Sequence, residues 1–386
     1  MNKKERFLAA VNFKGVDRIP TSYRGIDFVS ESLLKYFKIN EPENLLKNYK
    51  ELIKAMGADF WSSGSKIGKF TTYIPGYSGP PPEQPYIDDG LFLFTLGIKS
   101  KIGKVKKYNY QYPNIGVEPP LANIENASDI NKDFLTTKLK LFDFRSYTNK
   151  YKNRYGNTDL SYESIKKSDE DFICIGSLNC FFMICSYLRG MDKFLMDLVS
   201  NKKLAEFLIS EVGEFCLEFS KQELLNFGKR ADYYSGWDDV AGQSGMLFSP
   251  EIFKKYFLPL YKRLIANVKK EGLVFNWHCC GSVHSILPCM IDAGIDIFDV
   301  VQTSAKDMEL EKMFKMYGKI ICMHGGIDVQ KLLIFGSKKD IENEVKKVIG
   351  LWGNNGGIIL APSHEVLPET PIENILTIFN TVNKLS

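Results

Sequence analysis

The sequence predicts a (β/α)8 barrel, the TIM-barrel fold, and three observations lead to this fold class. Short apolar runs alternate with amphipathic helical stretches along the chain, an order typical of α/β proteins with a parallel sheet. Several of the runs are mostly apolar rather than alternating, as strands buried on both faces are. No G-x-G-x-x-G motif follows the first run, which disfavours the doubly wound open sheet.

Eight of these runs are predicted to be the strands of the barrel. In chain order they are residues 17–23, 58–63, 171–177, 231–237, 273–279, 295–301, 319–325 and 357–363. Two of the helices between them carry clear end signals. Ser249 and Pro250 begin a helix that ends near Gly272, with lysines in its last turn. Ser337 begins a second helix of the same plan, which ends at Gly353.

One long segment interrupts this alternation. Between Gly64 and Asp171 lies a Pro- and Tyr-rich stretch followed by two short extended runs, at residues 90–103 and 104–112. A loop of this length with strands of its own is usually functional, as a lid or pocket wall. We therefore expect a single barrel domain, residues 1–386, with a β-containing insertion at about 65–165 between strands two and three.

Composition argues against several classes of function. Fifty basic residues nearly balance 46 acidic ones, for a net charge of +4, without the concentrated basic surface of nucleic-acid-binding proteins. The N-terminal stretch lacks the apolar segment of a signal peptide, and the apolar runs are shorter than the roughly 20 residues that a bilayer span needs. The eight cysteines lie mostly in apolar runs, which fits buried, reduced thiols. We expect a cytoplasmic protein that binds neither nucleic acid nor membrane.

The candidate functional residues cluster at the predicted strand ends, where barrel enzymes build their sites. Three of the four histidines fall there, and the fourth, His284, begins a helix just after Cys280. The residues predicted to bind substrate at these ends are Arg24, Asn179, Gln302, His324 and Asp328.

The most informative pair is His278 and Cys280, at the end of the fifth strand. Two residues apart on a strand, they point to the same face, whereas Cys279 points to the other. Imidazole and thiolate together suit Zn²⁺, and a catalytic zinc takes about three protein ligands and one open position. His364, at the end of the eighth strand, is the first candidate for the third ligand, and Cys322 and His324 are the next.

Other interpretations of these residues stay open. His278 and Cys280 could form a nucleophile pair, although a Cα separation of about 6–7 Å makes direct contact awkward. Asp238 and Asp239, in "GWDDVAG", are candidate catalytic carboxylates, of which strand alternation lets only one face the pocket. The stretch "HGGID" ending at Asp328 is either a loop that approaches a ligand or a tight turn whose aspartate caps the next helix.

Several long stretches resemble the uroporphyrinogen decarboxylase superfamily. They are "KERFLAAVNFKGVDRIP", "GWDDVAGQSGMLFSPEIFKKYFLPLYKRLI", "FNWHCCGSVHSILPCMIDAGIDIFDVVQTSAKDM", "HGGIDVQKLL" and "LAPSHEVLPETPIENILTIFNTV". The resemblance covers nearly the whole chain and implies a (β/α)8 barrel. It also implies one of two chemistries, metal-free decarboxylation of uroporphyrinogen or zinc-dependent methyl transfer with methylcobalamin on a partner corrinoid protein.

Two positions separate these branches. The decarboxylases carry two arginines in an M-R-Q-A-G-R stretch that grips substrate carboxylates; "TSYRGIDF" keeps Arg24 but has Phe28 in the second place. The methyltransferases carry H-x-C at the fifth strand, as His278 and Cys280 do, and often a cysteine near the eighth, where this chain has His364. The decarboxylases have a histidine there that contacts substrate, so His364 is either a metal ligand or a substrate contact.

The resemblance therefore implies a zinc-dependent methyltransferase that moves a methyl group between methylcobalamin and a small-molecule acceptor or donor. A thiol held deprotonated at the metal would attack the methyl group and leave Co(I), and Asp238 or Asp239 would orient the acceptor or a ligand. No Asp-x-His-x-x-Gly motif is present, so the cobalamin would arrive on a partner. A metal-free decarboxylase and a non-catalytic binding barrel are the alternatives.

Overall fold

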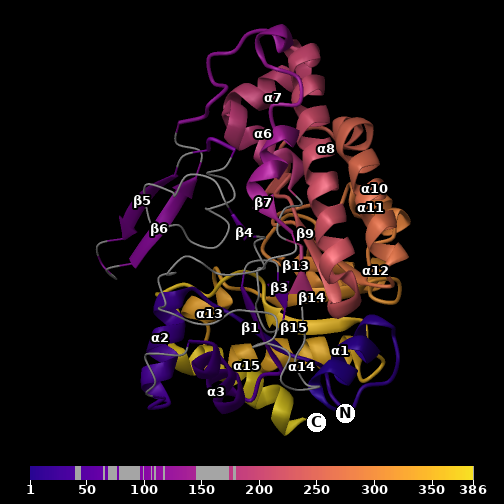
Figure 1. Ribbon diagram of the computed structural model, residues 1–386. Coiled ribbons are helices and arrows are strands. Elements are labelled where there is room, and N and C mark those ends of the chain that lie inside the picture. Colours follow the sequence, from indigo (N-terminus) through magenta and orange to yellow (C-terminus); the bar gives the residue numbers. More distant parts are fainter. Residues whose placement is uncertain are drawn as a thin grey trace.

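The structure is a computed structural model that describes residues 1–39, 45–63, 66–67, 76–77, 96–98, 100–105, 107, 110–115, 118–144, 174–176 and 180–385. Within these residues, eight parallel strands form the centre of the molecule (Figure 1). They are β1 (Ser22–Arg24), β2 (Phe60–Ser63), β8 (Cys174–Ile175), β9 (Tyr233–Trp237), β12 (Val274–His278), β13 (Ile297–Val301), β14 (Cys322–Ile327) and β15 (Ile358–Pro362). Each of the eight predicted strands overlaps one of them.

The strand order is that of a barrel. Six strands form one sheet in the order β15-β14-β13-β12-β9-β8, and β1 pairs with β2. A parallel bridge from Thr21 to Leu360 joins β1 to β15. Neighbours in space are therefore neighbours in chain order, and the first strand meets the last, as in the TIM barrel. The predicted fold class is confirmed.

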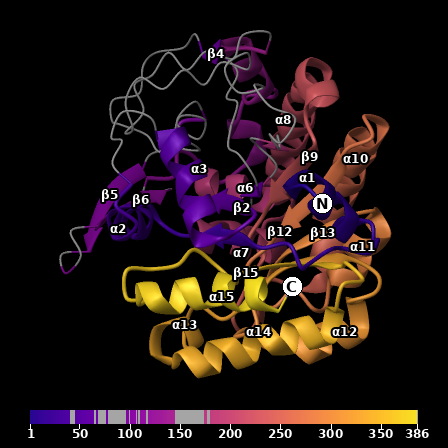
Figure 2. The ribbon, with the colours of Figure 1, turned by 90° about the horizontal axis from the view of Figure 1, so that it is seen from below.

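Helices lie outside the strands, and α12, α14 and α15 pack side by side there (Figure 2). The helices are α1 (Lys3–Val11), α2 (Asp27–Tyr36), α3 (Leu45–Met56), α6 (Phe181–Arg189), α7 (Met191–Ser200), α8 (Lys202–Phe227), α9 (Pro250–Ile252), α10 (Leu258–Lys270), α11 (Leu287–Ala293), α12 (Leu310–Tyr317), α13 (Leu332–Phe335), α14 (Lys338–Trp352) and α15 (Ile372–Lys384). None of the helices in the described parts of the chain is both long and apolar enough to cross a membrane.

The two predicted helix starts are confirmed. The Ser249 hydroxyl accepts from the backbone N–H of Ile252, and Ser337 begins α14 with a full capping box, because its side chain and that of Asp340 bond each other's backbone N–H. The first of these helices is interrupted by a π-helical turn, η5 (Phe253–Phe257). Pro259 follows this turn, and since proline has no N–H to donate, the regular hydrogen-bond ladder cannot continue through it.

The region between β2 and β8 contains short antiparallel strands. β3 (Lys66–Ile67) pairs with β2, β4 (Gly76–Tyr77) with β7 (Phe142–Asp143), and β5 (Ser100–Val105) with β6 (Tyr110–Ile115). The β5–β6 hairpin stands away from the barrel (Figure 1). It overlaps the two predicted extended runs. Long stretches of the predicted insertion, about 65–165, lie outside the described residues.

Further short elements complete the described chain. They are the 3-10 turns η2 (Ala127–Asp129), η3 (Thr136–Leu141) and η4 (Gly228–Arg230), and the β10 (Ala241–Gly242) and β11 (Gly245–Met246) pair that follows β9.

The barrel interior changes character along its axis. Where the strands begin, Phe7 of α1 packs on Phe60 and Tyr233 with ring centroids 5.7 Å apart in both pairs. Ile297, Cys322 and Ile359 belong to the same buried cluster, so this end is filled with apolar side chains. Further along, the strands turn buried polar side chains inward. They include Ser22, Arg24, Asp299 and His324. The polar layer lies directly beneath the strand ends where the site was predicted.

Candidate metal centre

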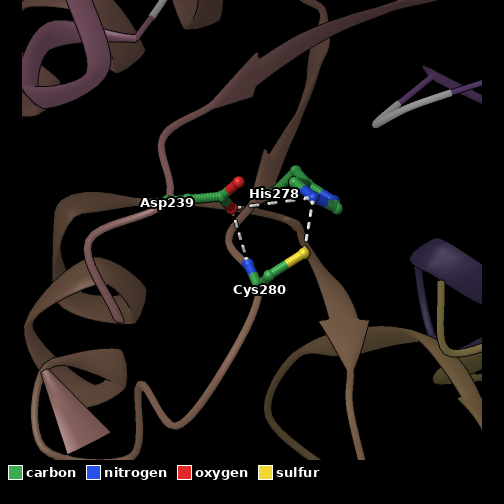
Figure 3. A group of neighbouring side chains, drawn as sticks. All are labelled: Asp239, His278 and Cys280. Carbon is green, nitrogen blue, oxygen red and sulfur yellow. Dashed lines mark hydrogen bonds and ion pairs between the residues drawn. The ribbon is translucent and has the colours of Figure 1, made fainter. Parts of the chain in front are cut away.

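Three potential metal ligands meet just beyond the ends of β9 and β12 (Figure 3). Ligand atoms of Asp239, His278 and Cys280 all lie within 4.8 Å of one another. The Sγ of Cys280 lies 3.4 Å from Nε2 of His278, which confirms that the two side chains share a face. The expectation that their Cα spacing makes direct contact awkward is wrong, because the two side chains converge beyond the backbone. Asp239 Oδ1 accepts from the Cys280 N–H at 2.9 Å and lies 4.0 Å from His278 Nε2.

The turn after β12 gives Cys280 its direction. Gly281 has a φ of 86°, and a side chain there would place its Cβ 2.6 Å from the carbonyl oxygen of Gly242, so only glycine fits. Its N–H donates to the Gln302 amide oxygen at 2.7 Å. The N–H of Cys279 donates to the Asp299 carbonyl at 2.7 Å, and its side chain is fully buried. The backbone is therefore held on both sides of the Cys280 thiol.

The charges of the site favour a thiolate beside an imidazolium. Burial opposes the shift, but Asp299 and Cys280 raise the pKa of His278 well above its ordinary value. Burial also opposes the shift at Cys280, yet His278, with a smaller contribution from His364, lowers the pKa of its thiol. The thiolate of Cys280 is the form that a divalent metal needs, whereas His278 must give up the proton on Nε2 when it binds the metal.

The donor atoms fit zinc. In a tetrahedral site, nitrogen at about 2.0–2.1 Å and sulfur at about 2.3 Å from zinc lie about 3.6 Å from each other, close to the 3.4 Å observed between His278 and Cys280. The imidazole–thiolate pair is a set that zinc prefers over harder cations. Asp239 offers an oxygen beside them, and His364 interacts with the Cys280 thiol from an exposed position, an interaction that raises the pKa of His364. Both are candidates for the third ligand.

The sequence interpretation missed Asp299, which lies directly behind His278. Its carboxylate is fully buried on β13, and Oδ2 lies 2.5 Å from His278 Nδ1. Burial opposes ionisation, but Arg24, His278 and His324 hold the pKa of Asp299 well below its ordinary value. A charged residue within the apolar run "IDIFDVV" was the signal that pointed to it.

Asp238 does not face the cluster. Its carboxylate accepts from the N–H groups of Phe182 and Met183, at 2.8 and 2.9 Å, and from the Tyr261 hydroxyl at 3.0 Å. The N–H groups of Phe182 and Met183 belong to the first turn of α6, where backbone donors lack partners within the helix. Burial raises the pKa of Asp238 to about 7, against these bonds. As strand alternation predicted, only one of the two, Asp239, faces His278 and Cys280, and the catalytic role predicted for Asp238 has no support in these contacts.

Arg24 and His324 are engaged inside the barrel instead of lining an open pocket. Arg24 is 1% exposed and pairs with Asp299 at 2.8 Å. His324 is fully buried, with Nδ1 at 2.8 Å from Asp299 and Nε2 at 2.6 Å from the Ser22 hydroxyl. Both nitrogens have partners, so substrate binding by Arg24, and either substrate binding or metal ligation by His324, stay predictions that require these buried contacts to be released. Cys322 is corrected as a ligand, because it belongs to the apolar cluster at the other end.

The remaining predicted residues have structural surroundings. Gln302 holds the turn at Gly281. Asp328 accepts from the N–H groups of Gln330, Lys331 and Leu332 at 2.9 to 3.1 Å. It therefore caps the start of α13, as the second interpretation of "HGGID" expected. Asn179 lies outside the described residues.

Comparison with known proteins identifies relatives of both chemistries. The profile of the family "Uroporphyrinogen decarboxylase (URO-D)" matches residues 144–385. A uroporphyrinogen decarboxylase of Trichodesmium erythraeum is 28% identical over 200 residues, 50% of this chain and 53% of that protein. A methylcobamide:CoM methyltransferase of Methanosarcina barkeri is 27% identical over 196 residues, 49% of this chain and 54% of that protein. The chain thus spans about half the length of the curated relatives it matches.

A solved structure shares the fold over the whole chain. A methyltransferase from Methanosarcina mazei superposes with a TM-score of 0.62 at 18% identity, and covers 100% of this chain and 99% of its own. At this identity the likeness establishes the architecture alone.

Proposed function

The chain belongs to the uroporphyrinogen decarboxylase family, and from that premise we propose that it is a zinc-dependent methyltransferase. It would move a methyl group between a corrinoid carried on a partner protein and a small molecule. The observation that carries this proposal is the contact of 3.4 Å between His278 Nε2 and Cys280 Sγ, a spacing and a pair of elements that suit a zinc ion. The similarity to a methylcobamide:CoM methyltransferase supports it.

In this proposal His278 and Cys280 hold the metal, and Asp239 or His364 supplies the third ligand. Held by these residues, a zinc ion would supply Lewis-acid chemistry that favours the deprotonated form of a thiol acceptor. The sulfur of that acceptor forms a bond to the methyl carbon of the corrinoid. The cobalt–carbon bond breaks, and its electron pair stays on cobalt as Co(I). With a methyl donor instead of an acceptor, the bond between the donor atom and the methyl carbon would break, its electron pair would stay on the donor atom, and Co(I) would form the cobalt–carbon bond.

Decarboxylation of a highly anionic porphyrinogen is the second candidate, since a uroporphyrinogen decarboxylase is among the relatives. The state of Arg24 argues against it. The guanidinium that would grip a substrate carboxylate is 1% exposed and already paired with Asp299. Releasing it would leave a buried carboxylate without its main cation, which is strongly unfavourable.

Metal analysis combined with a transfer assay tests the proposal. Protein purified without added metal is expected to contain near-stoichiometric zinc, and Cys280→Ser is expected to contain background levels only. Cys289→Ser is the matched control, because this thiol is also partly exposed and donates to the Ile286 carbonyl at 2.9 Å. The zinc-loaded protein should convert methylcobalamin to Co(I) in the presence of a panel of thiols, followed by visible absorption, and Cys280→Ser should not.

Two results would contradict the proposal. One is wild-type protein free of zinc that still removes carboxyl groups from uroporphyrinogen. The other is zinc content that is unchanged in Cys280→Ser, because the metal would then lie elsewhere in the protein.

A further inference from the structure

The strongest unexplained feature of the barrel is the side-chain cluster around Asp299. In the strand register, Asp299 of β13 is paired with His278 of β12 on one side and with His324 of β14 on the other. The three side chains therefore stand side by side at one level of the barrel. Asp299 and His324 are fully buried, and His278 is 7% exposed. Only His278 of the three reaches the metal centre.

The chemistry of the carboxylate fixes which atoms carry hydrogen. An ionised carboxylate only accepts hydrogen bonds. Asp299 Oδ2 lies 2.5 Å from His278 Nδ1, and Oδ1 lies 2.8 Å from His324 Nδ1. Both imidazoles must then carry hydrogen on Nδ1. For His278 this leaves Nε2, the nitrogen beside Cys280, as the atom that faces the metal centre.

The carboxylate itself is held from two further sides. Nη2 of Arg24 donates to both of its oxygens, at 3.0 and 2.8 Å. His324 is fixed in turn by Ser22, whose hydroxyl lies 2.6 Å from Nε2. With hydrogen on Nδ1, the Nε2 of a neutral His324 accepts from the serine hydroxyl, and burial, which lowers the pKa of His324, favours that neutral form. Asp299 is thus anchored to β1 and β14 by contacts that do not involve His278.

We propose that Asp299 is a positioning residue of the metal site, which holds the His278 imidazole with Nε2 directed at the metal while Arg24 and His324 hold the carboxylate in place. This inference rests on the proposed function, because it takes His278 as a metal ligand. A carboxylate behind a metal-bound histidine sets its tautomer, its orientation and its basicity, and the loss of such a partner typically lowers metal affinity about 10- to 100-fold.

The affinity for zinc, measured by competition with a chromophoric chelator, tests the proposal. Asp299→Asn is expected to bind zinc about 10- to 100-fold more weakly than the wild type. Asp59→Asn is the matched control. Asp59 is also a buried carboxylate bound by arginines, with Arg6 and Arg18 both at 2.7 Å, but it lies where the strands begin. Its substitution should leave zinc affinity unchanged.

A measurement on the unaltered protein covers the case in which Asp299→Asn does not fold. The chain has four histidines, so long-range ¹H–¹⁵N spectra of the zinc-loaded wild type can be assigned ring by ring. We expect His278 to carry hydrogen on Nδ1 and to bind zinc through Nε2.

The outcomes separate this inference from the proposed function. If the wild type binds zinc and a folded Asp299→Asn binds it with the same affinity, the role of Asp299 is overturned and the methyltransferase proposal stands. If the spectra show zinc bound through Nδ1 of His278, the role of Asp299 is likewise overturned and the methyltransferase proposal stands. A wild-type protein that binds no zinc overturns both.

Discussion

The two ends of the barrel both contain a buried carboxylate held by basic side chains, yet they are built for different tasks. Where the strands begin, Asp59 accepts from Arg6 and Arg18, and Arg6 also pairs with Asp17. Among the described residues, the other hydrogen bonds of these groups go to the backbone, to a threonine hydroxyl or to the N-terminal amine, and not to a metal ligand. Near the strand ends, Asp299 accepts from Arg24 and two imidazoles. Here one donor, His278, has a second nitrogen that points onward to Cys280.

Two cysteines, Cys322 at the start of β14 and Cys280 just beyond the end of β12, show the same contrast. Cys322 is fully buried among apolar side chains at the first end, and burial raises the pKa of its thiol. At Cys280 the neighbouring His278 outweighs burial, and the pKa of the thiol is lowered. The difference teaches that residue type and strand position are not sufficient to mark a ligand. The neighbouring side chains on adjacent strands decide whether a thiol is an inert, buried core group or a reactive one.

The largest expected effect lies at the end of the barrel where the strands begin. Asp59→Asn leaves the partly buried guanidinium groups of Arg6 and Arg18 without their shared carboxylate. We expect the free energy of unfolding to fall by about 3–5 kcal/mol, the usual cost of breaking a buried pair by removing one partner. Urea denaturation followed by circular dichroism measures it. A loss below about 1 kcal/mol would mean that this network behaves like an exposed one.

The next effect distinguishes the two candidates for the third zinc ligand. Asp239 lies in the tight group with His278 and Cys280, whereas His364 is exposed at the rim. We therefore expect Asp239→Asn to lower zinc affinity at least about tenfold, a free-energy change of about 1.4 kcal/mol, and His364→Ala to lower it less. Chelator competition on both variants gives the ranking. The reverse ranking would restore His364 as the ligand, as the sequence predicted.

The smallest effect concerns the two partly exposed thiols of the metal-free protein. The pKa of Cys280 is lowered, mainly by His278 against the effect of burial, whereas burial raises the pKa of Cys289. Only thiolate reacts with iodoacetamide, so at pH 7 we expect Cys280 to be alkylated before Cys289, as measured by peptide mass spectrometry. The preference should narrow as the pH rises and Cys289 also ionises. His278→Ala should remove the preference for Cys280. Equal alkylation rates for Cys280 and Cys289 in the wild type would argue against the imidazolium–thiolate pair.

The architecture could be predicted from the sequence because the residue patterns that indicate strands and helix ends are local. All eight predicted strand segments overlap barrel strands, since a strand buried on both faces needs a run of apolar residues that is visible in the sequence. The caps at Ser249 and Ser337 involve residues three positions apart. The pairing of His278 with Cys280 follows from strand alternation in the same way.

The sequence by itself thus determined the barrel, the end of the barrel where the candidate metal centre lies, and the His278–Cys280 pair at that end. Only the tertiary structure decided that Asp239 faces the pair while Asp238 caps α6, that Asp299 stands behind His278, and that Arg24 is already paired. The physical reason is sequence separation. Arg24 and Asp299 are 275 positions apart, and such a contact depends on the register of strands around a closed sheet, which no local pattern records.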